Sequence, residues 1–148
     1  MTRADNAARP AVMKRAAIMP WLAISLLALA LMIPALTRPP FTHDSFWIDI
    51  SWADQFTAEL RRGVLWPRWL PASHDGLGAP VFYFYPPAAF WLTGLFGLAG
   101  LATWPALLAS FGTLLWASGA TMYLWLRDRA QRPLAGAFLY MAMPYHLF

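Results

Sequence analysis

The sequence predicts an all-α integral membrane protein, and three observations support this prediction. Hydrophobic residues make up 59% of the 148 residues and charged residues only 12%, whereas a soluble domain averages about 25% charged residues. Long apolar runs alternate with short polar segments. Trp, Tyr and Phe together reach 16%, as is typical of chains whose aromatic rings lie at membrane–water interfaces. So few polar side chains do not cover a water-soluble surface.

The first apolar run predicts a transmembrane helix over residues 16–37. Ser25 is the only clearly polar residue between 16 and 36, and a helix of this length spans about 31 Å, the thickness of a bilayer core. A cleaved signal peptide is the rival interpretation, but residues 37–40 lack the small-x-small cleavage pattern. Residues 1–15 are basic, and we expect them to be disordered or to lie on the cytoplasmic face.

Residues 38–100 form an outer loop that holds two predicted surface helices. The first covers about 45–62, with Gly63 as its stop signal. Its apolar side chains recur every four residues, at Ile48, Trp52, Phe56 and Leu60. Such an amphipathic helix lies flat on a membrane surface. The second covers about 87–100, which is too short after Pro86-Pro87 to cross a bilayer.

The positive-inside rule sets the expected topology. Residues 101–126 are apolar and long enough to span a bilayer, which returns the chain to the cytoplasm. The turn at 127–132 carries Arg127, Arg129 and Arg132, so we place it inside. Residues 133–148 begin a third span and stop short of its full length. We therefore expect a multi-pass protein of the cell (inner) membrane, of which this chain is an N-terminal portion that is inactive alone.

Several function classes are disfavoured by composition. The chain has no cysteine, so disulfides and thiolate chemistry are excluded. Its three histidines, at positions 43, 74 and 146, are too scattered for a local zinc motif. The basic clusters flank apolar runs, which is typical of membrane helices rather than of nucleic-acid binding. No charged residue lies mid-span, which argues against a transporter.

Asp44 is the strongest candidate for a functional acid. It follows the outer end of the first span and stands beside His43. A short acidic side chain here also suits a helix N-cap, and both roles remain open. Asp49 and Asp54 are weaker candidates, because an intact helix keeps them from sharing one small ion with Asp44.

Five further residues are candidates for substrate binding, and the first of them is His43, beside Asp44. Arg61, Arg62 and Arg68 suit the oxygens of a lipid phosphate, although snorkelling alone also explains arginines at an interface. His146 follows Pro144-Tyr145 in the third apolar run, where a polar side chain suits an internal cavity. His74-Asp75 lies in a Gly- and Pro-rich loop, where turn geometry explains it.

The motifs resemble those of a known family. The chain resembles, from about residue 20 onward, the bacterial membrane family labelled 6-pyruvoyl-tetrahydropterin-synthase-related, and its layout resembles the GT-C class of membrane glycosyltransferases. The motifs are Thr42-His43-Asp44, Gly63-Val64-Leu65-Trp66-Pro67-Arg68-Trp69-Leu70-Pro71, Gly76-Leu77-Gly78-Ala79-Pro80-Val81-Phe82, Phe84-Tyr85-Pro86-Pro87 and Met143-Pro144-Tyr145-His146. Pterin chemistry is not expected, because the chain lacks the zinc ligands of a soluble pterin enzyme.

The resemblance implies transfer of a sugar from a polyprenyl-phosphate carrier on the outer face. Asp44 then corresponds to the acid that acts as a base or helps to hold a divalent metal, Mg²⁺ or Mn²⁺. Its neighbour is Ser45 rather than the second acid of many GT-C enzymes, which leaves a metal-free base open. The expected partners are the lipid bilayer and the polyprenyl-phosphate-linked sugar. The alternative is a non-catalytic lipid-handling or scaffold protein of the same fold.

Overall fold

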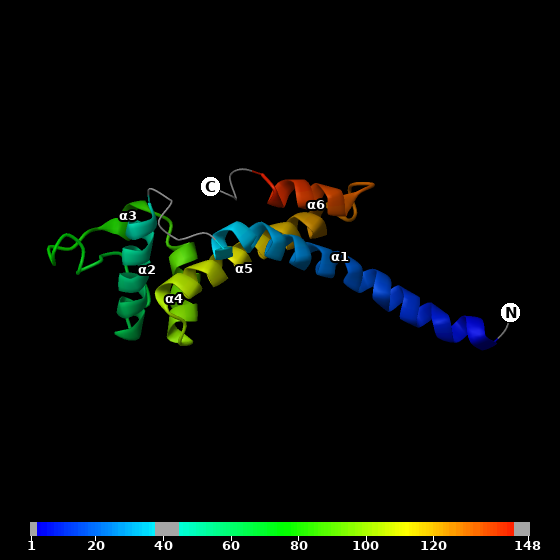
Figure 1. Cartoon of the computed structure of the whole chain (residues 1–148), viewed down its shortest axis with the longest axis horizontal. Coiled ribbons are helices and arrows are strands. Elements are labelled where there is room, and N and C mark those ends of the chain that lie inside the picture. Colours follow the sequence, from blue (N-terminus) through cyan, green and yellow to red (C-terminus); the bar gives the residue numbers. More distant parts are fainter. Residues whose placement is uncertain (1–2, 38–44, 144–148) are drawn as a thin grey trace. The chain divides into compact units, whose positions relative to one another are not determined.

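The computed structural model describes the backbone of residues 3–37 and 45–143, and the side chains of residues 18–37 and 45–143. The described backbone is helical, and its one β interaction is an isolated antiparallel bridge between Leu70 and Ala79. The helices of Figure 1 are α1 (Arg3–Thr37), α2 (Phe46–Arg61), α3 (Val81–Phe84), α4 (Ala88–Leu98), α5 (Thr103–Leu126) and α6 (Pro133–Met141).

Two helices are long and apolar enough to cross a membrane. They are the segment Ile18–Thr37 of α1, with 20 residues, and α5, with 24 residues. Both exceed or match the ~20 residues that a bilayer core requires. Large apolar side chains on these helices are exposed, such as Leu26 at 67% and Leu29 at 64%.

Helix α1 begins at Arg3, so most of the range 1–15 is helical, whereas disorder was one of two expectations for this range. The other expectation, that these residues lie on the cytoplasmic face, stays a prediction. Alanine has the highest intrinsic helix propensity, and the segment contains alanine at positions 4, 7, 8 and 11. The helical preference of these residues therefore extends the membrane-length segment toward the N-terminus.

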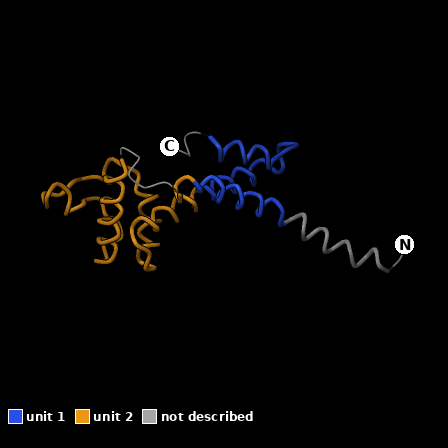
Figure 2. Tube along the Cα trace, viewed as in Figure 1, with its two compact units in different colours: residues 1–33, 115–148 blue, residues 34–114 orange. Residues whose placement is uncertain are grey.

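The chain divides into two compact units, shown in Figure 2 and described separately here. Unit 1 comprises Met1–Ile33 and Leu115–Phe148. Its buried core joins Ile24 and Ala28 of α1, Leu115 of α5 and Met141 of α6.

Small and polar residues bring the helices of unit 1 together. Gly119 lies directly against the side chain of Met141, where a Cβ atom would overlap the sulfur. The indole Nε1 of Trp116 donates a hydrogen bond of 3.0 Å to Ser25 Oγ. Ser25, the one polar residue of the first apolar run, thus bonds a tryptophan of α5. Close approach at a glycine, as at Gly119, is a common way for apolar helices to pack.

Unit 2 comprises Pro34–Leu114 and is organised by α2 and α4, which pack side by side (Figure 1). Phe56 contacts Trp91, and Arg61 reaches Gly97, so the two helices run in the same direction. Gly94 and Gly97 let α2 approach closely, because a Cβ at Gly97 would lie 2.7 Å from Thr57 Cγ2. Both helices lie near the ranges expected from the sequence, 45–62 and 87–100.

The apolar ladder of α2 is divided between the interior of the protein and its surface. Phe56 and Leu60 are buried inside the protein, where the sequence predicted a face turned to the membrane, whereas Ile48 is 49% exposed and Trp52 is only partly buried. A residue step of four advances about 40° beyond a full helical turn, so three such steps rotate Ile48 well away from the face of Leu60. The N-terminal part of the helix instead buries Phe46 and Ala53.

Helix α2 ends in a Schellman motif, a common arrangement at helix C-termini. Gly63 has a φ of 85°. Its N–H donates to Leu60 O at 3.0 Å, and the N–H of Val64 donates to Glu59 O at 3.0 Å. Gly63 therefore satisfies the last carbonyl groups of α2 and turns the chain into the next segment.

Substitutions at Gly63 test this turn. A Cβ at Gly63 meets no atom within 4 Å, so the cost of Gly63→Ala comes from its positive φ alone, about 1–2 kcal/mol for an ordinary L-residue. Gly63→Asn is expected to cost less, because asparagine tolerates this conformation. Equal losses in the unfolding midpoints of the two variants, measured on the full chain in micelles, contradict the assignment.

The hydrogen bond between Ser25 and Trp116 predicts a second effect. Ser25→Ala removes the acceptor and is expected to lower the stability of the full chain by about 0.6–1.7 kcal/mol, the range for interhelical bonds in bilayers. Ser118→Ala is the matched control, because its hydroxyl bonds only the carbonyl of Leu115 on its own helix. Comparable thermal shifts for both variants in lipid nanodiscs show that the bond contributes nothing to helix association.

Candidate functional site

Three of the candidate site residues lie outside the described part of the structure. They are His43, Asp44 and His146. The roles expected for them from the sequence therefore remain predictions. The described residues do contain Arg61, Arg62 and Arg68, all of which belong to unit 2.

The three arginines have different partners, although the sequence suggests one shared role. Arg61 Nη2 donates a hydrogen bond of 3.0 Å to the carbonyl oxygen of Gly97. Because Gly97 is in the last turn of α4, the guanidinium also lies at the negative end of that helix dipole. Arg61 thus has a structural role in joining α2 to α4.

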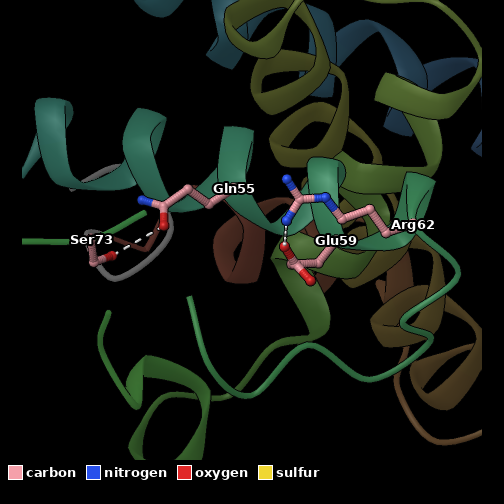
Figure 3. A network of polar contacts seen from close by, with 4 residues as sticks. All are labelled: Gln55, Glu59, Arg62 and Ser73. Carbon is pink, nitrogen blue, oxygen red and sulfur yellow. Dashed lines mark hydrogen bonds and ion pairs between the residues drawn. The ribbon is translucent and has the colours of Figure 1, made fainter. Parts of the chain in front are cut away.

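Arg62 forms an ion pair with Glu59. Its Nη1 lies 2.7 Å from Glu59 Oε1, one helical turn earlier, as Figure 3 shows. The Glu59 side chain is only 12% exposed, so the arginine neutralises a carboxylate that is largely shielded from water. Exposed i,i+3 pairs contribute little to stability, and the arrangement fixes the carboxylate more than it stabilises the fold.

Arg68 lines a groove on the surface of unit 2. The groove has a volume of about 420 Å³ and lies beside the C-terminal end of α2. It brings together residues from three stretches of the sequence, which meet only in the folded chain. Its lining includes Glu59, Trp66, Pro67, Arg68, Trp69 and Tyr83.

Backbone hydrogen bonds hold the walls of this groove in place. Leu70 and Ala79 exchange two bonds of 2.9 and 3.0 Å, and the N–H of Phe82 donates to Arg68 O at 3.1 Å. Pro67 is fully buried. These bonds fix the segment that carries Arg68 against α3.

Two aromatic rings of the groove, Trp69 and Tyr83, have contacts that limit their movement. The indole of Trp69 lies on Gly78, where a Cβ would overlap the ring. The guanidinium carbon of Arg68 lies 5.5 Å from the centroid of the Tyr83 ring, which is a cation–π distance. The groove therefore has a defined shape before any ligand binds.

The loop that ends at Gly78 is tied to α2. Ser73 Oγ donates a hydrogen bond of 3.2 Å to Gln55 Oε1 (Figure 3). His74 and Asp75 have φ angles of 51° and 56°, a region in which His and Asp are among the enriched residue types. A turn accounts for both residues. His74 also borders a second, smaller hollow of about 260 Å³ with Ser51 and Trp52.

Glu59 is the groove residue to which the sequence assigns no role. Its carboxylate belongs to the groove wall and is held by Arg62. The sequence feature that could have indicated this position is the i,i+3 spacing of Glu59 and Arg62 at the end of an amphipathic helix. This spacing is also common on solvated faces, so it does not identify a groove. Only the path of the segment after Gly63 shows that Glu59 faces the residues around Arg68.

The described residues do not fit a divalent metal. Within 18–37 and 45–143 there is no group of three or more His, Asp or Glu side chains that could bind one. Asp54 instead accepts a hydrogen bond of 3.1 Å from Thr103 Oγ1, and Glu59 is paired with Arg62. Hard cations such as Mg²⁺ prefer several oxygen ligands together, so no step of the chemistry is assigned to a metal here.

Comparison of the chain with protein-family models, with curated proteins and with solved structures finds no match. The function is therefore inferred from the residues themselves and from the resemblance of their motifs.

The contacts of the arginines predict which of them matters for stability. Arg61→Met removes a charged hydrogen bond to a helix-end carbonyl and is expected to destabilise the full chain by about 1.5–3 kcal/mol. Arg62→Met is the comparison variant and is expected to cost less than Arg61→Met, because the Arg62 side chain is 68% exposed and its ion pair joins two residues of the same helix. Equal unfolding midpoints for the two variants in micelles contradict these assignments.

Proposed function

We propose that the chain is the N-terminal portion of a membrane glycosyltransferase that takes its sugar from a polyprenyl-phosphate carrier on the extracytoplasmic face. The observation that carries the proposal is that one resembling motif, Gly63 to Pro71, supplies most of the lining of one groove. Its Pro67-Arg68-Trp69 element lines this hollow together with Glu59 and Tyr83, which lie outside the motifs.

The exposed apolar surface of the long helices supports a membrane location. On α1, large apolar side chains such as Leu22, Leu26 and Ile33 are more than half exposed. Soluble monomers rarely expose a continuous apolar stripe of this length. We place the protein in the inner membrane as a multi-pass protein, with a cytoplasmic N-terminus and the basic residues 127–132 on the same side.

The proposed chemistry needs a base and a cationic partner for the leaving group. Asp44 accepts the proton of the acceptor hydroxyl as its oxygen bonds to the anomeric carbon of the sugar. The bond between that carbon and the phosphate oxygen breaks, and polyprenyl phosphate leaves. A guanidinium binds phosphate oxygens in two parallel hydrogen bonds, and Arg68 is the arginine of the groove that has no ion-pair partner among the described residues.

The alternative is a lipid-handling or scaffold protein with the same fold and no catalysis. The half-exposed rings of Trp66 and Trp69 favour binding of an amphipathic molecule and require no reaction. Catalysis by the full-length protein distinguishes the two functions, because a binding protein leaves the carrier-linked sugar intact.

Substitution of Asp44 tests the proposed reaction. Asp44→Asn in the full-length protein is expected to reduce sugar transfer at least about 100-fold, since general-base catalysis contributes about 10²–10⁴-fold. Asp49→Asn is the matched control, because Asp49 lies on helix α2 away from the groove lining. The assay follows consumption of radiolabelled polyprenyl-phosphate sugar in membranes. Transfer that survives Asp44→Asn excludes the proposed role of this acid.

A further inference from the structure

The rings of the groove are exposed to a degree that packing does not explain. Trp66 is 55% exposed, Trp69 50% and Tyr83 61%. Burial of a large aromatic side chain lowers the free energy of the folded protein. Three rings that stay exposed in one hollow therefore contribute little to this stabilisation. The hollow therefore suits a ligand that covers ring faces.

The same hollow offers hydrogen-bonding groups between its rings. Glu59 uses Oε1 for Arg62, and its Oε2 has no partner among the described residues. Arg68 contributes a guanidinium with several N–H donors at the other wall. Carboxylate and guanidinium groups each bind two neighbouring hydroxyls through paired hydrogen bonds.

We propose that this groove binds a short oligosaccharide, with sugar rings stacked on Trp66, Trp69 and Tyr83 and their hydroxyls bonded to Glu59 and Arg68. Sugars combine C–H faces with rows of hydroxyls, and the negative faces of aromatic rings attract C–H groups. The hollow of about 420 Å³ is open to the surroundings, so it suits a ligand that lies along the surface.

The rigidity of the groove strengthens the inference. Trp69 is held against Gly78, and Arg68 is held over Tyr83. Glu59 is fixed by Arg62. A site that is ordered before binding loses less conformational entropy when the ligand arrives. The inference rests on the proposed function only in the choice of a saccharide.

The test uses the full chain in lipid nanodiscs on an array of neutral and acidic oligosaccharides. At least one saccharide is expected to bind above the level of nanodiscs without protein. Calorimetric titration of the best binder is expected to show about tenfold weaker affinity for Trp66→Ala, which loses one stacked ring and its buried area. Glu59→Gln, which keeps the side-chain shape, is expected to weaken binding as well.

Trp125→Ala is the matched control. Trp125 is 55% exposed, like Trp66, but it belongs to unit 1. The affinity of the Trp125→Ala variant for the saccharide is expected to stay within twofold of that of the parent chain.

Three results overturn the inference. The first is that no saccharide binds on the array. The second is that the Trp66→Ala and Trp125→Ala variants bind the saccharide with equal affinity. The third is that a decaproline peptide displaces the bound saccharide at a lower concentration than free saccharide does. The last result assigns the aromatic groove to a proline-rich peptide. Two readouts separate this inference from the proposed function, because saccharide binding by a full-length protein that transfers no sugar would keep the inference and contradict the proposed function.

Discussion

The close approach of α2 and α4 at two glycines determines the geometry of unit 2. Leu60 fills the space above Gly94, and Thr57 fills the space above Gly97. Because both helices run in the same direction, their C-terminal ends lie together, and Arg61 reaches the last turn of α4. The chain then turns at Gly63, which positions the segment of Arg68 beside Glu59. A wider separation of the helices would remove this alignment and open the wall of the groove.

The positions of most helices could be predicted from the sequence, but the residues that these helices contact in the folded chain could not. The helices α2, α4 and α5 lie near the expected ranges because hydrophobic periodicity, Gly63 and Pro86-Pro87 act locally. The burial of Phe56 and Leu60 inside the protein could not be predicted, since the face that α2 buries is set by α4, more than 30 residues later. The groove could not be predicted for the same reason, because Glu59, the segment 64–71 and Tyr83 meet only in the folded chain.

The two units make complementary contributions to the proposed function. Helix α5 begins in unit 2 and ends in unit 1, so one continuous helix connects the groove-bearing unit to the apolar helices. The exposed leucines and isoleucines of α1 suit lipid, whereas the groove combines aromatic rings with charged groups and suits an amphipathic ligand. This division of surfaces agrees with the proposal that the protein stays in the membrane and binds a molecule at its outer face.

The central claim is that the chain crosses the membrane and presents unit 2 outside. Since the chain has no cysteine, single cysteines report the side of the membrane on which they lie. Leu77→Cys is suitable because Leu77 is 83% exposed in unit 2, and Gln131→Cys marks the exposed basic turn. A membrane-impermeant maleimide is predicted to label Leu77→Cys in intact cells and Gln131→Cys only after permeabilisation. Labelling of both positions in intact cells, or of Gln131→Cys alone, would contradict the account.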